Sequence, residues 1–282
     1  MKFFIGSHQP QWLADDRFVD VPLFVSRRTL AQRKTLPRAV TSWALDSGGF
    51  TELQMHGRWT ITPRDYADEV RRFRDEVGGL AWAAPQDWMC EPIVLAGGDA
   101  ARGIRFAGTG LTVEEHQRRT VENFLELRSI APDLPFVPVL QGWSMYDYWR
   151  CEDLYAAAGV DLRSEPTVGV GTVCRRQGTH EATRIMKSLA AGGLRLHGFG
   201  FKVLGLRASA GDLASADSLA WSETARRAPP LPGHDKPGPG RRTGHINCAN
   251  CAEYALRWRA SLLAELRQRE GEQLEMFAER AA

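Results

Sequence analysis

The chain has 282 residues, of which 43% are hydrophobic and 25% charged, and its formal net charge is +2. This length can bury one large core, and the composition is ordinary for a globular protein. No stretch approaches the roughly 20 apolar residues of a membrane span, so no membrane partner is expected. The near-neutral charge excludes a global basic field, and any nucleic-acid contact must come from a local cluster of cations.

The first residues and the cysteines predict the cellular setting. The segment MKFFIGSHQPQW has a short apolar run without a small-residue cleavage site, so we interpret it as a first strand and not as a signal peptide. The chain has five cysteines, and an odd number without a signal predicts reduced thiols and a cytoplasmic protein.

Short apolar segments alternate with amphipathic or capped ones along most of the chain. The predicted strands are residues 2–6, 21–26, 43–45, 80–84, 136–140, 167–173, 194–201 and 217–221. The predicted helices are residues 63–77, 112–128, 145–158, 179–191, 204–214 and 252–280. Residues 224–244 are rich in proline, glycine and arginine, which predicts an irregular loop.

This alternation predicts an α/β fold with βαβ units and a parallel sheet. About eight strands at this spacing favour a closed (β/α)8 barrel of the TIM type over an open sheet. We assign residues 1–225 to this catalytic core. Residues 226–282 then hold the basic loop, an HxxCxxC element and a C-terminal helix packed on the barrel. The active site is expected at the C-terminal ends of the strands.

Asp46 follows apolar residues 43–45 in the segment WALDSGGF and is predicted to end that strand. Gly48 and Gly49 let the backbone turn sharply and approach a ligand closely, and Phe50 places an aromatic face just past the turn. A carboxylate beside an aromatic ring at a strand end is suited to binding a base. The alternative is an ordinary Asp-Ser-Gly turn with Phe50 in the core.

Six segments arrive in an order typical of one enzyme family: ALDSGGF, PQDWMCEP, VLQGW, VGVGTV, LHGFGF and ASADSLAWS. On these motifs the chain resembles the tRNA-guanine transglycosylase superfamily. Its shortness and the segments TVEEHQRRTVENF and HGFGFK are most similar to the short DpdA-type members, which exchange guanine in DNA for a 7-deazaguanine base. The resemblance implies a bacterial or phage-encoded protein.

The resemblance implies two catalytic residues, Asp217 as nucleophile and Asp46 as acid/base. Replacing a base without net hydrolysis needs a covalent sugar–enzyme intermediate, and a carboxylate supplies the nucleophile at C1′ as in retaining glycosidases. A second acidic group must protonate the departing base and deprotonate the incoming one.

The resemblance also implies a pocket for the base. Phe50 and Phe199 would cover its two faces and replace the stacking that it loses. Asp87 would accept hydrogen bonds from the guanine N1 and N2 donors, and Gln141 would read the same edge. The remaining substrate-binding positions are Gly142, Gly171 and Gly200.

The expected function is therefore a DNA-guanine transglycosylase that inserts a 7-cyano-7-deazaguanine-type base through a covalent Asp–sugar intermediate. Its partners would be DNA and the free 7-deazaguanine base. The same residues leave open a tRNA-guanine transglycosylase with tRNA as partner, a hydrolytic base glycosylase and a non-catalytic nucleic-acid-binding barrel. A homodimer and partner modification enzymes are also left open.

The tRNA enzymes of the superfamily carry a zinc site of three closely spaced cysteines and a later histidine, and this chain departs from it. The segment HINCANC supplies His245, Cys248 and Cys251 at a spacing suited to zinc, and His234 in the preceding loop would be a fourth ligand. We expect a structural Zn²⁺ here. The alternative is a relic site without metal.

Two basic clusters are candidates for contacts with the phosphates of nucleic acid. One runs from Arg27 to Arg38, where a solvated basic face is an equal alternative. The other follows the proposed nucleophile, so its loop is expected beside the sugar under attack. It consists of Arg226, Arg227, Lys236, Arg241 and Arg242.

Overall fold

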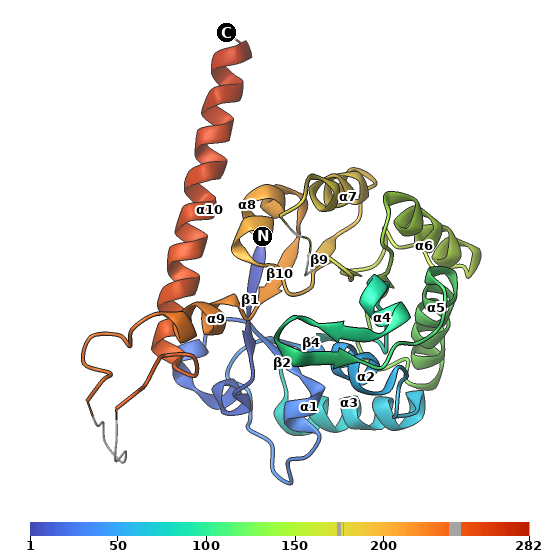
Figure 1. The fold of residues 1–282 in the computed structure, drawn as a ribbon, viewed down its shortest axis with the longest axis horizontal. Helices are drawn as coiled ribbons and strands as arrows, with labels where there is room; N and C mark the ends of the chain where they lie inside the picture. Colours follow the sequence, from blue (N-terminus) through green and yellow to red (C-terminus); the bar gives the residue numbers. More distant parts are fainter. Residues whose placement is uncertain (174–175, 177, 237–243, 282) are drawn as a thin grey trace.

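A computed structural model of the chain describes residues 1–173, 176, 178–236 and 244–281, leaving out the side chains of Arg102 and residues 272–281. Its centre is an eight-stranded, all-parallel sheet that curls and is surrounded by helices (Figure 1). The strand order is β4-β3-β2-β1-β10-β9-β8-β7. The strands are β1 Lys2–Ser7, β2 Leu23–Ser26, β3 Trp43–Asp46, β4 Leu80–Ala83, β7 Val139–Leu140, β8 Val168–Val170, β9 Leu196–Gly198 and β10 Ser215–Ser218.

The two ends of this strand order are linked by a parallel bridge between Ala83 and Phe136. The Ala83 N–H donates to the Pro135 carbonyl (3.0 Å), and the Val137 N–H donates to the Ala83 carbonyl (3.1 Å). Because Phe136 lies just before β7, the bridge joins the β4 edge to the segment leading into the β7 edge. The predicted α/β fold with a parallel sheet is therefore confirmed.

The helices follow the strands and pack mostly on the outside of the sheet (Figure 1). They are α1 Arg27–Leu30, α2 Gly49–His56, α3 Pro63–Val77, α4 Pro92–Ala96, α5 Val113–Ile130, α6 Met145–Ala157, α7 His180–Ala191, α8 Val203–Ser209, α9 Ala220–Arg227 and α10 Ala252–Ala281. An antiparallel hairpin, β5 Gly98–Ala100 and β6 Ile104–Phe106, lies between α4 and α5. Short 3-10 helices are η1 Pro10–Ala14, η2 Asp16–Phe18, η3 Ala101–Gly103 and η4 Ala210–Asp212.

Local signals fix the starts of the long helices. Thr62 caps α3 by accepting from the Asp65 N–H, and Pro63 occupies the first helical position, where its missing N–H costs nothing. Thr112 caps α5 by accepting from the Glu115 N–H. Ser144 and Asp147 form a capping box at α6. The predicted starts of the first two helices are confirmed.

Alternation along the strands separates two cores. Phe4, Phe24 and Ala44 belong to an inner cluster with Trp82, Ala84 and Val137. Their chain neighbours face the opposite way, into the larger cluster between the sheet and the helices. Trp43, for example, is fully buried in that outer cluster. Apolar residues on both faces are what a parallel sheet covered by helices requires.

Two boundaries near the end of the sheet differ from the prediction. The last strand is β10, Ser215–Ser218, and the apolar residues expected to extend it through 221 begin α9 instead. Trp221 is fully buried and donates its Nε1–H to the Gly6 carbonyl (2.9 Å), so a helical turn buries it better than a longer strand. The irregular segment expected from residue 224 accordingly starts only after Arg227.

The predicted C-terminal helix is confirmed as α10. The Trp258 ring packs on Phe3 of the first strand with ring centroids 6.0 Å apart, and Arg259 donates to the Phe3 carbonyl (3.3 Å). Further along, Arg207 of α8 pairs with Glu265. The helix then continues past the sheet and its surrounding helices (Figure 1). Among the described residues, no helix is both long enough and apolar enough to cross a membrane.

Candidate active site and metal cluster

A pocket of about 380 Å³ opens where the strands end, within the roughly 300–1,000 Å³ range of small-ligand sites. Each strand of the curled sheet contributes a wall residue at or just beyond its C-terminal end. In chain order these are Ser7, Ser26, Asp46, Ala84, Gln141, Gly171, Phe199 and Asp217. Because parallel strands point the same way, residues more than 200 positions apart in the chain share one cavity.

Asp217 lies on β10 and is only 5% exposed. Its Oδ1 accepts the backbone N–H of Gly200 (2.8 Å) and faces His197 Nε2 at 3.3 Å. Both of these contacts are made by one carboxylate oxygen. The side chain is thereby held in one orientation at the pocket wall.

Asp46 is the last residue of β3, and its carboxylate accepts the Gly48 N–H (3.2 Å). Burial raises the pKa of Asp46, the hydrogen bonds from Gly48 and Ser26 lower it, and the neighbouring charge of Asp217 raises it. Arg28 lowers it slightly. A carboxyl whose pKa is raised is suited to carry a proton, as a general acid must.

Asp87, Gln141 and Thr172 form a hydrogen-bonded chain across the pocket. The Thr172 hydroxyl donates to Gln141 Oε1 (2.6 Å), which orients the amide so that Gln141 Nε2 donates to Asp87 Oδ2. Thr172 has φ +57°, a strained value for a β-branched residue, and is held there partly by the Cys90 N–H on its hydroxyl (2.8 Å). Burial raises the pKa of Asp87 to about 7 against the opposing effect of the Gln141 hydrogen bond.

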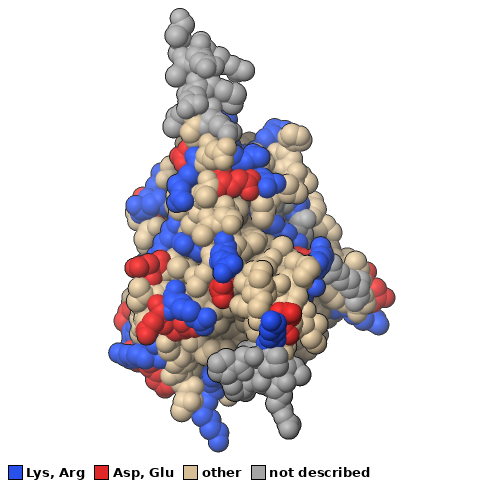
Figure 2. All heavy atoms as spheres, turned by 90° about the vertical axis from the view of Figure 1, so that its left-hand side faces the viewer, with Lys and Arg blue, Asp and Glu red and all other residues tan. Residues whose placement is uncertain are grey.

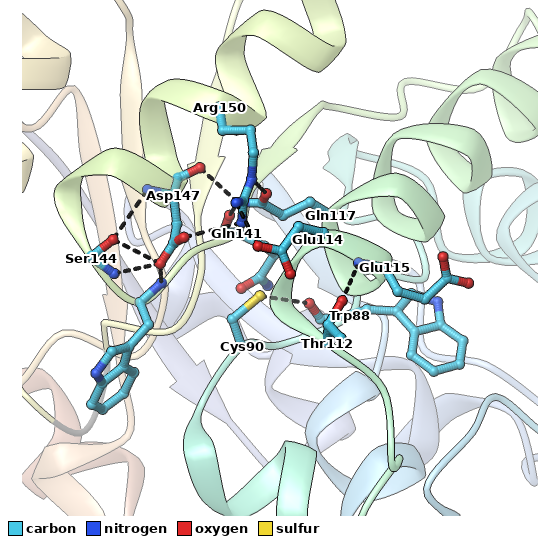
Figure 3. A network of polar contacts seen from close by, with 11 residues as sticks. Trp88, Cys90, Thr112, Glu114, Glu115, Gln117, Gln141, Ser144, Asp147 and Arg150 are labelled. Atoms are coloured by element: carbon cyan, nitrogen blue, oxygen red, sulfur yellow. Dashed lines mark hydrogen bonds and ion pairs between the residues drawn. The ribbon is translucent and has the colours of Figure 1, made fainter.

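A second network fixes the backbone at the end of β7, where Gln141 lies (Figure 3). The buried Gln117 amide donates to the carbonyls of Gln141 and Asp147, both at 2.6 Å. Arg150 in turn donates to Gln117 Oε1 (2.7 Å). Every polar atom of the buried Gln117 amide is therefore used, which makes the turn rigid.

Two glycines of β8 and its end make room for pocket side chains. A Cβ on Gly171 would lie 2.2 Å from Gln141 Nε2, and a Cβ on Gly169 would lie 2.5 Å from the Phe199 ring. The glycines of the segment VGVGTV thus allow close approach of side chains to the backbone.

The two aromatic rings expected to hold a base both line the pocket. Phe50 is on α2 and packs edge-on against Phe106 of the hairpin, with ring centroids 5.7 Å apart. Phe199 follows β9 and packs against Phe24 and Trp82. The two rings therefore come from different parts of the chain and are supported by separate apolar clusters.

Some of the predicted binding residues lie away from the pocket. Gly142 is not among its lining residues and packs against Asp147 at the start of α6. Arg226 and Arg227 are exposed on α9 and not in a loop, and Arg227 pairs with Glu223 (2.7 Å). The other basic residues of that cluster are the exposed Lys236, and Arg241 and Arg242, which lie outside the described residues.

Among the residues that the structure describes, the basic clusters do not form a continuous field. On the face that carries α9 and α10, basic and acidic side chains are interspersed (Figure 2). In the other cluster, Arg27 is paired with Glu69 and Glu52 and is largely buried, while Arg38 donates to the carbonyl of Asp75 (2.9 Å). Arg28 remains exposed and contacts Gly48 beside the pocket.

Several pocket residues were not singled out from the sequence. Ser26, Thr172 and Glu91 line the pocket. His197 is not a lining residue and contacts Asp217 from behind the pocket wall. Ser26 and Thr172 lie at strand ends, so the strand pattern alone marks their positions. No sequence pattern around Glu91 or His197 marks them as site residues, because tertiary contacts with distant segments bring them to the site.

Four side chains of the C-terminal segment form a cluster that can hold a metal ion: His234, His245, Cys248 and Cys251, whose ligand atoms all lie within 4.8 Å of one another. His234 Nδ1 is 3.7 Å from Cys248 Sγ and 3.6 Å from Cys251 Sγ. A tetrahedral ion with ordinary zinc–sulfur and zinc–nitrogen bonds separates its ligands by about 3.6 Å. The other nitrogen of His234 faces Glu253 at 3.1 Å, the carboxylate contact that orients metal-binding histidines.

A hydrogen bond between Asn250 and His8 connects the segment of the metal cluster with the pocket wall. Asn250, between the two cysteines, hydrogen-bonds the ring of His8, which lines the pocket. The His8 ring stacks on Trp221 with an interplanar angle of 8°. The loop that holds the metal ligands is thus joined to the wall of the active-site candidate.

A pocket lined by carboxylates, an amide and aromatic rings at the strand ends of a parallel sheet has the features of a small-ligand site. The chain belongs to the DpdA family, described as DeoxyPurine in DNA protein A, whose family model matches residues 1–278. Membership confirms the resemblance and implies a transglycosylase-type enzyme of DNA modification. A comparison with curated proteins gives no match.

The close approach at Gly171 gives a testable prediction for stability. Gly171→Ala should lower the free energy of unfolding by about 1–3 kcal/mol, the usual cost of overpacking, because the new methyl group collides with the Gln141 amide. The measurement is urea unfolding. Gly211→Ala is the matched control, since no atom lies within 4 Å of its Cβ position. Equal effects of the two changes would contradict the prediction.

The raised pKa of Asp87 predicts a pH-dependent stability. An aspartate ionises near 3.9 when unfolded, and Asp87 ionises near 7 when folded, so the folded state binds the extra proton between these values. Wild-type stability should therefore fall as pH rises from about 4 to about 7, and Asp87→Asn should remove this component. The difference in unfolding free energy between the two proteins should grow over that range and level off above it. Asp20→Asn, at an exposed position, is the control, and a difference independent of pH would refute the prediction.

Proposed function

We propose that the protein is a DNA-guanine transglycosylase that exchanges guanine in DNA for a 7-deazaguanine base of the 7-cyano-7-deazaguanine type. The observation that carries this proposal is the presence of Asp217 and Asp46 in one pocket with the hydrogen-bonded pair Asp87 and Gln141. Family membership supports DNA as the substrate class. The incoming base and the covalent mechanism are parts of the proposal that family membership does not supply.

In the proposed first step, Asp217 attacks C1′ of the deoxyribose. The bond from C1′ to the guanine nitrogen breaks, its electron pair leaves with the base, and Asp46 gives its proton to that base. The raised pKa of Asp46 keeps this carboxyl protonated over a wider pH range, as a general acid requires. The enzyme then holds the sugar as an ester of Asp217.

The second step runs the same chemistry in reverse. The incoming deazaguanine loses a proton to Asp46, its nitrogen attacks C1′, and the ester bond to Asp217 breaks. One carboxylate thus serves twice as nucleophile and leaving group, and the other serves as acid and then as base.

The wall formed by Asp87 and Gln141 is suited to a guanine edge. When ionised, Asp87 offers acceptors for the N1–H and exocyclic N2–H groups of guanine, and Gln141 Nε2 already points into the same region. Phe50 and Phe199 offer aromatic faces for the ring. A guanine in duplex DNA must leave the stack to reach this pocket, which costs a few kcal/mol.

We further propose that the curled sheet is a (β/α)8 barrel of the TIM type, with the Ala83–Phe136 bridge as its closing contact. Residues 1–225 would form this catalytic core, and residues 226–282 would be an appended element that holds a structural zinc ion. The four ligands His234, His245, Cys248 and Cys251 match the chemistry of such a site. Zinc would fix the loop around Asn250 and, through it, the position of His8.

The function is tested by incubating the enzyme with DNA and with tRNA, each with 7-cyano-7-deazaguanine, followed by mass spectrometry of the nucleosides. Asp217→Asn should abolish exchange, a loss of at least about 10⁴-fold, because no nucleophile remains. Its unfolding profile should stay close to that of the wild type. Modified tRNA with unmodified DNA would support the tRNA enzyme instead, and free guanine released without exchange would indicate a hydrolase.

Zinc is tested by metal analysis of protein prepared without chelator. About one zinc ion per chain is expected for four ligands around one centre. Cys251→Ser should lower the zinc content and the thermal midpoint together, because metal binding contributes to folding. His180→Ala, an exposed histidine on α7, should leave both unchanged. Zinc-free wild-type protein with an undiminished midpoint would refute the site.

The DNA path is tested by salt dependence. On duplex DNA, the logarithm of the binding constant falls linearly with the logarithm of the salt concentration, and each phosphate contact makes this slope steeper by about 0.9. Neutralising Arg226, Arg227, Arg241 and Arg242 together should weaken DNA binding and flatten this slope, without changing the affinity for the free base. Arg28→Gln is measured in parallel. A slope altered only in Arg28→Gln would place the DNA over α1 instead.

A further inference from the structure

His197 is a fully buried histidine on β9 with both ring nitrogens in polar contact. Nδ1 is 2.8 Å from the hydroxyl of Ser215, and Nε2 is 3.3 Å from Oδ1 of Asp217. Ser215 and Asp217 are alternate residues of β10, the neighbouring strand, so both point to the same side of the sheet as His197.

The chemistry of these partners assigns the protons. An ionised carboxylate can only accept, so Nε2 must carry the hydrogen in its contact with Asp217. In the neutral ring, Nδ1 is then the acceptor, and the Ser215 hydroxyl donates to it. Asp217 thereby fixes the histidine tautomer, and the Ser215 hydroxyl holds the ring from its other nitrogen.

Aromatic rings hold the imidazole in place. Their centroids lie 4.7–5.8 Å from that of His197, and they belong to Phe4, Phe24, Trp82 and Phe199. Phe199 lines the pocket as a candidate face for the base. His197 therefore contacts the candidate nucleophile through Nε2 and packs on the candidate base-stacking ring in a T-shaped arrangement.

Both donors on Asp217 meet at Oδ1: the Gly200 N–H and His197 Nε2–H. Among the described residues, no donor reaches Oδ2. A carboxylate that is held by one oxygen presents the other to an incoming electrophile. Gly200 and His197 together thus leave Oδ2 as the oxygen available for attack, and His197 is the side chain of the two.

We propose that His197, held by Ser215, is a positioning residue that binds Oδ1 of Asp217 and leaves Oδ2 as the attacking atom. Because the His197 ring also packs on Phe199, it fixes the position of the carboxylate relative to that ring. This inference rests on the proposed function, in which Asp217 is the nucleophile. It assigns His197 no contact with the substrate. Its effect should fall on the formation of the covalent intermediate and not on binding of the free base.

Three substitutions separate this role from simple packing. His197→Gln keeps a donor near the place of Nε2 but leaves part of the aromatic cage unfilled. His197→Phe fills the cage but donates nothing. Ser215→Ala leaves the ring in place but removes the hydrogen bond to Nδ1. Trp82→Phe is the control, because it loosens the same cage without removing a hydrogen bond to Asp217.

The readout is single-turnover formation of the covalent DNA–enzyme adduct, resolved on a denaturing gel, with the affinity for free 7-cyano-7-deazaguanine measured separately. His197→Phe should slow adduct formation by about 10- to 100-fold, the effect of losing a hydrogen bond to a charged group. His197→Gln should retain more of the rate than His197→Phe, and Ser215→Ala should fall between wild type and His197→Phe. All four variants should bind the free base as the wild type does.

A packing role predicts the reverse order, with His197→Phe as active as wild type and His197→Gln impaired, and that result would overturn the inference. Wild-type protein that forms no adduct would instead refute the proposed function. The inference would then be decided by crystal structures of the two variants. A carboxylate of Asp217 turned away from Gly200 in His197→Phe but not in His197→Gln would support it, and an unmoved carboxylate in both would overturn it.

Discussion

The cost of placing four carboxylates in one largely buried pocket is the constraint on which the rest of the site depends. Asp46, Asp87, Glu91 and Asp217 all line the cavity, and burial raises the pKa of Asp46 and Asp87. The three aspartates are given different sets of donors. Asp217 has a backbone N–H and a histidine, Asp46 has a backbone N–H and a serine, and Asp87 has an amide and the more distant hydroxyl of Ser47. Donors that differ in number and kind are what allow chemically identical groups to take different roles.

These donors are effective because the backbone behind them is rigid. Gln117 and Arg150 hold the turn that carries Gln141, and glycines at 169 and 171 let Phe199 and the Gln141 amide sit against β8. The strained φ of Thr172 lies in the same region. Rigid support of this kind lets a site keep its polar groups aimed at a ligand before the ligand arrives.

Much of the architecture could be predicted from the sequence, because strand and helix periodicities are local signals. The capped starts at Thr62 and Thr112 and the terminal helix were predicted in this way. The site residues Asp46, Asp87, Gln141 and Asp217 follow from motifs near strand ends, and the structure brings them into one pocket. Their individual roles remain proposals.

What could not be predicted depends on contacts between distant segments. Trp221 was assigned to a strand because an apolar run has no visible period over so few residues, and its burial against Gly6 settles the helical turn. The burial of Arg27 beside Glu69 removes it from a cluster that looks uniformly exposed in sequence. His197 and Glu91 likewise matter only through what the fold places next to them.

The interlocking of the two ends of the chain has a consequence for synthesis. The first strand, β1, pairs with β10 through residues 2–5, and its Phe3 packs on Trp258 of α10. The ring of His8, just after β1, bonds to Asn250. The other edge of β1 pairs with β2, so a chain emerging from the ribosome in order leaves one edge of β1 unpaired until residues 215–218 have been made. Completion of the sheet and of the pocket waits on the final segment, which gives the nascent chain a long interval with an unpaired apolar edge.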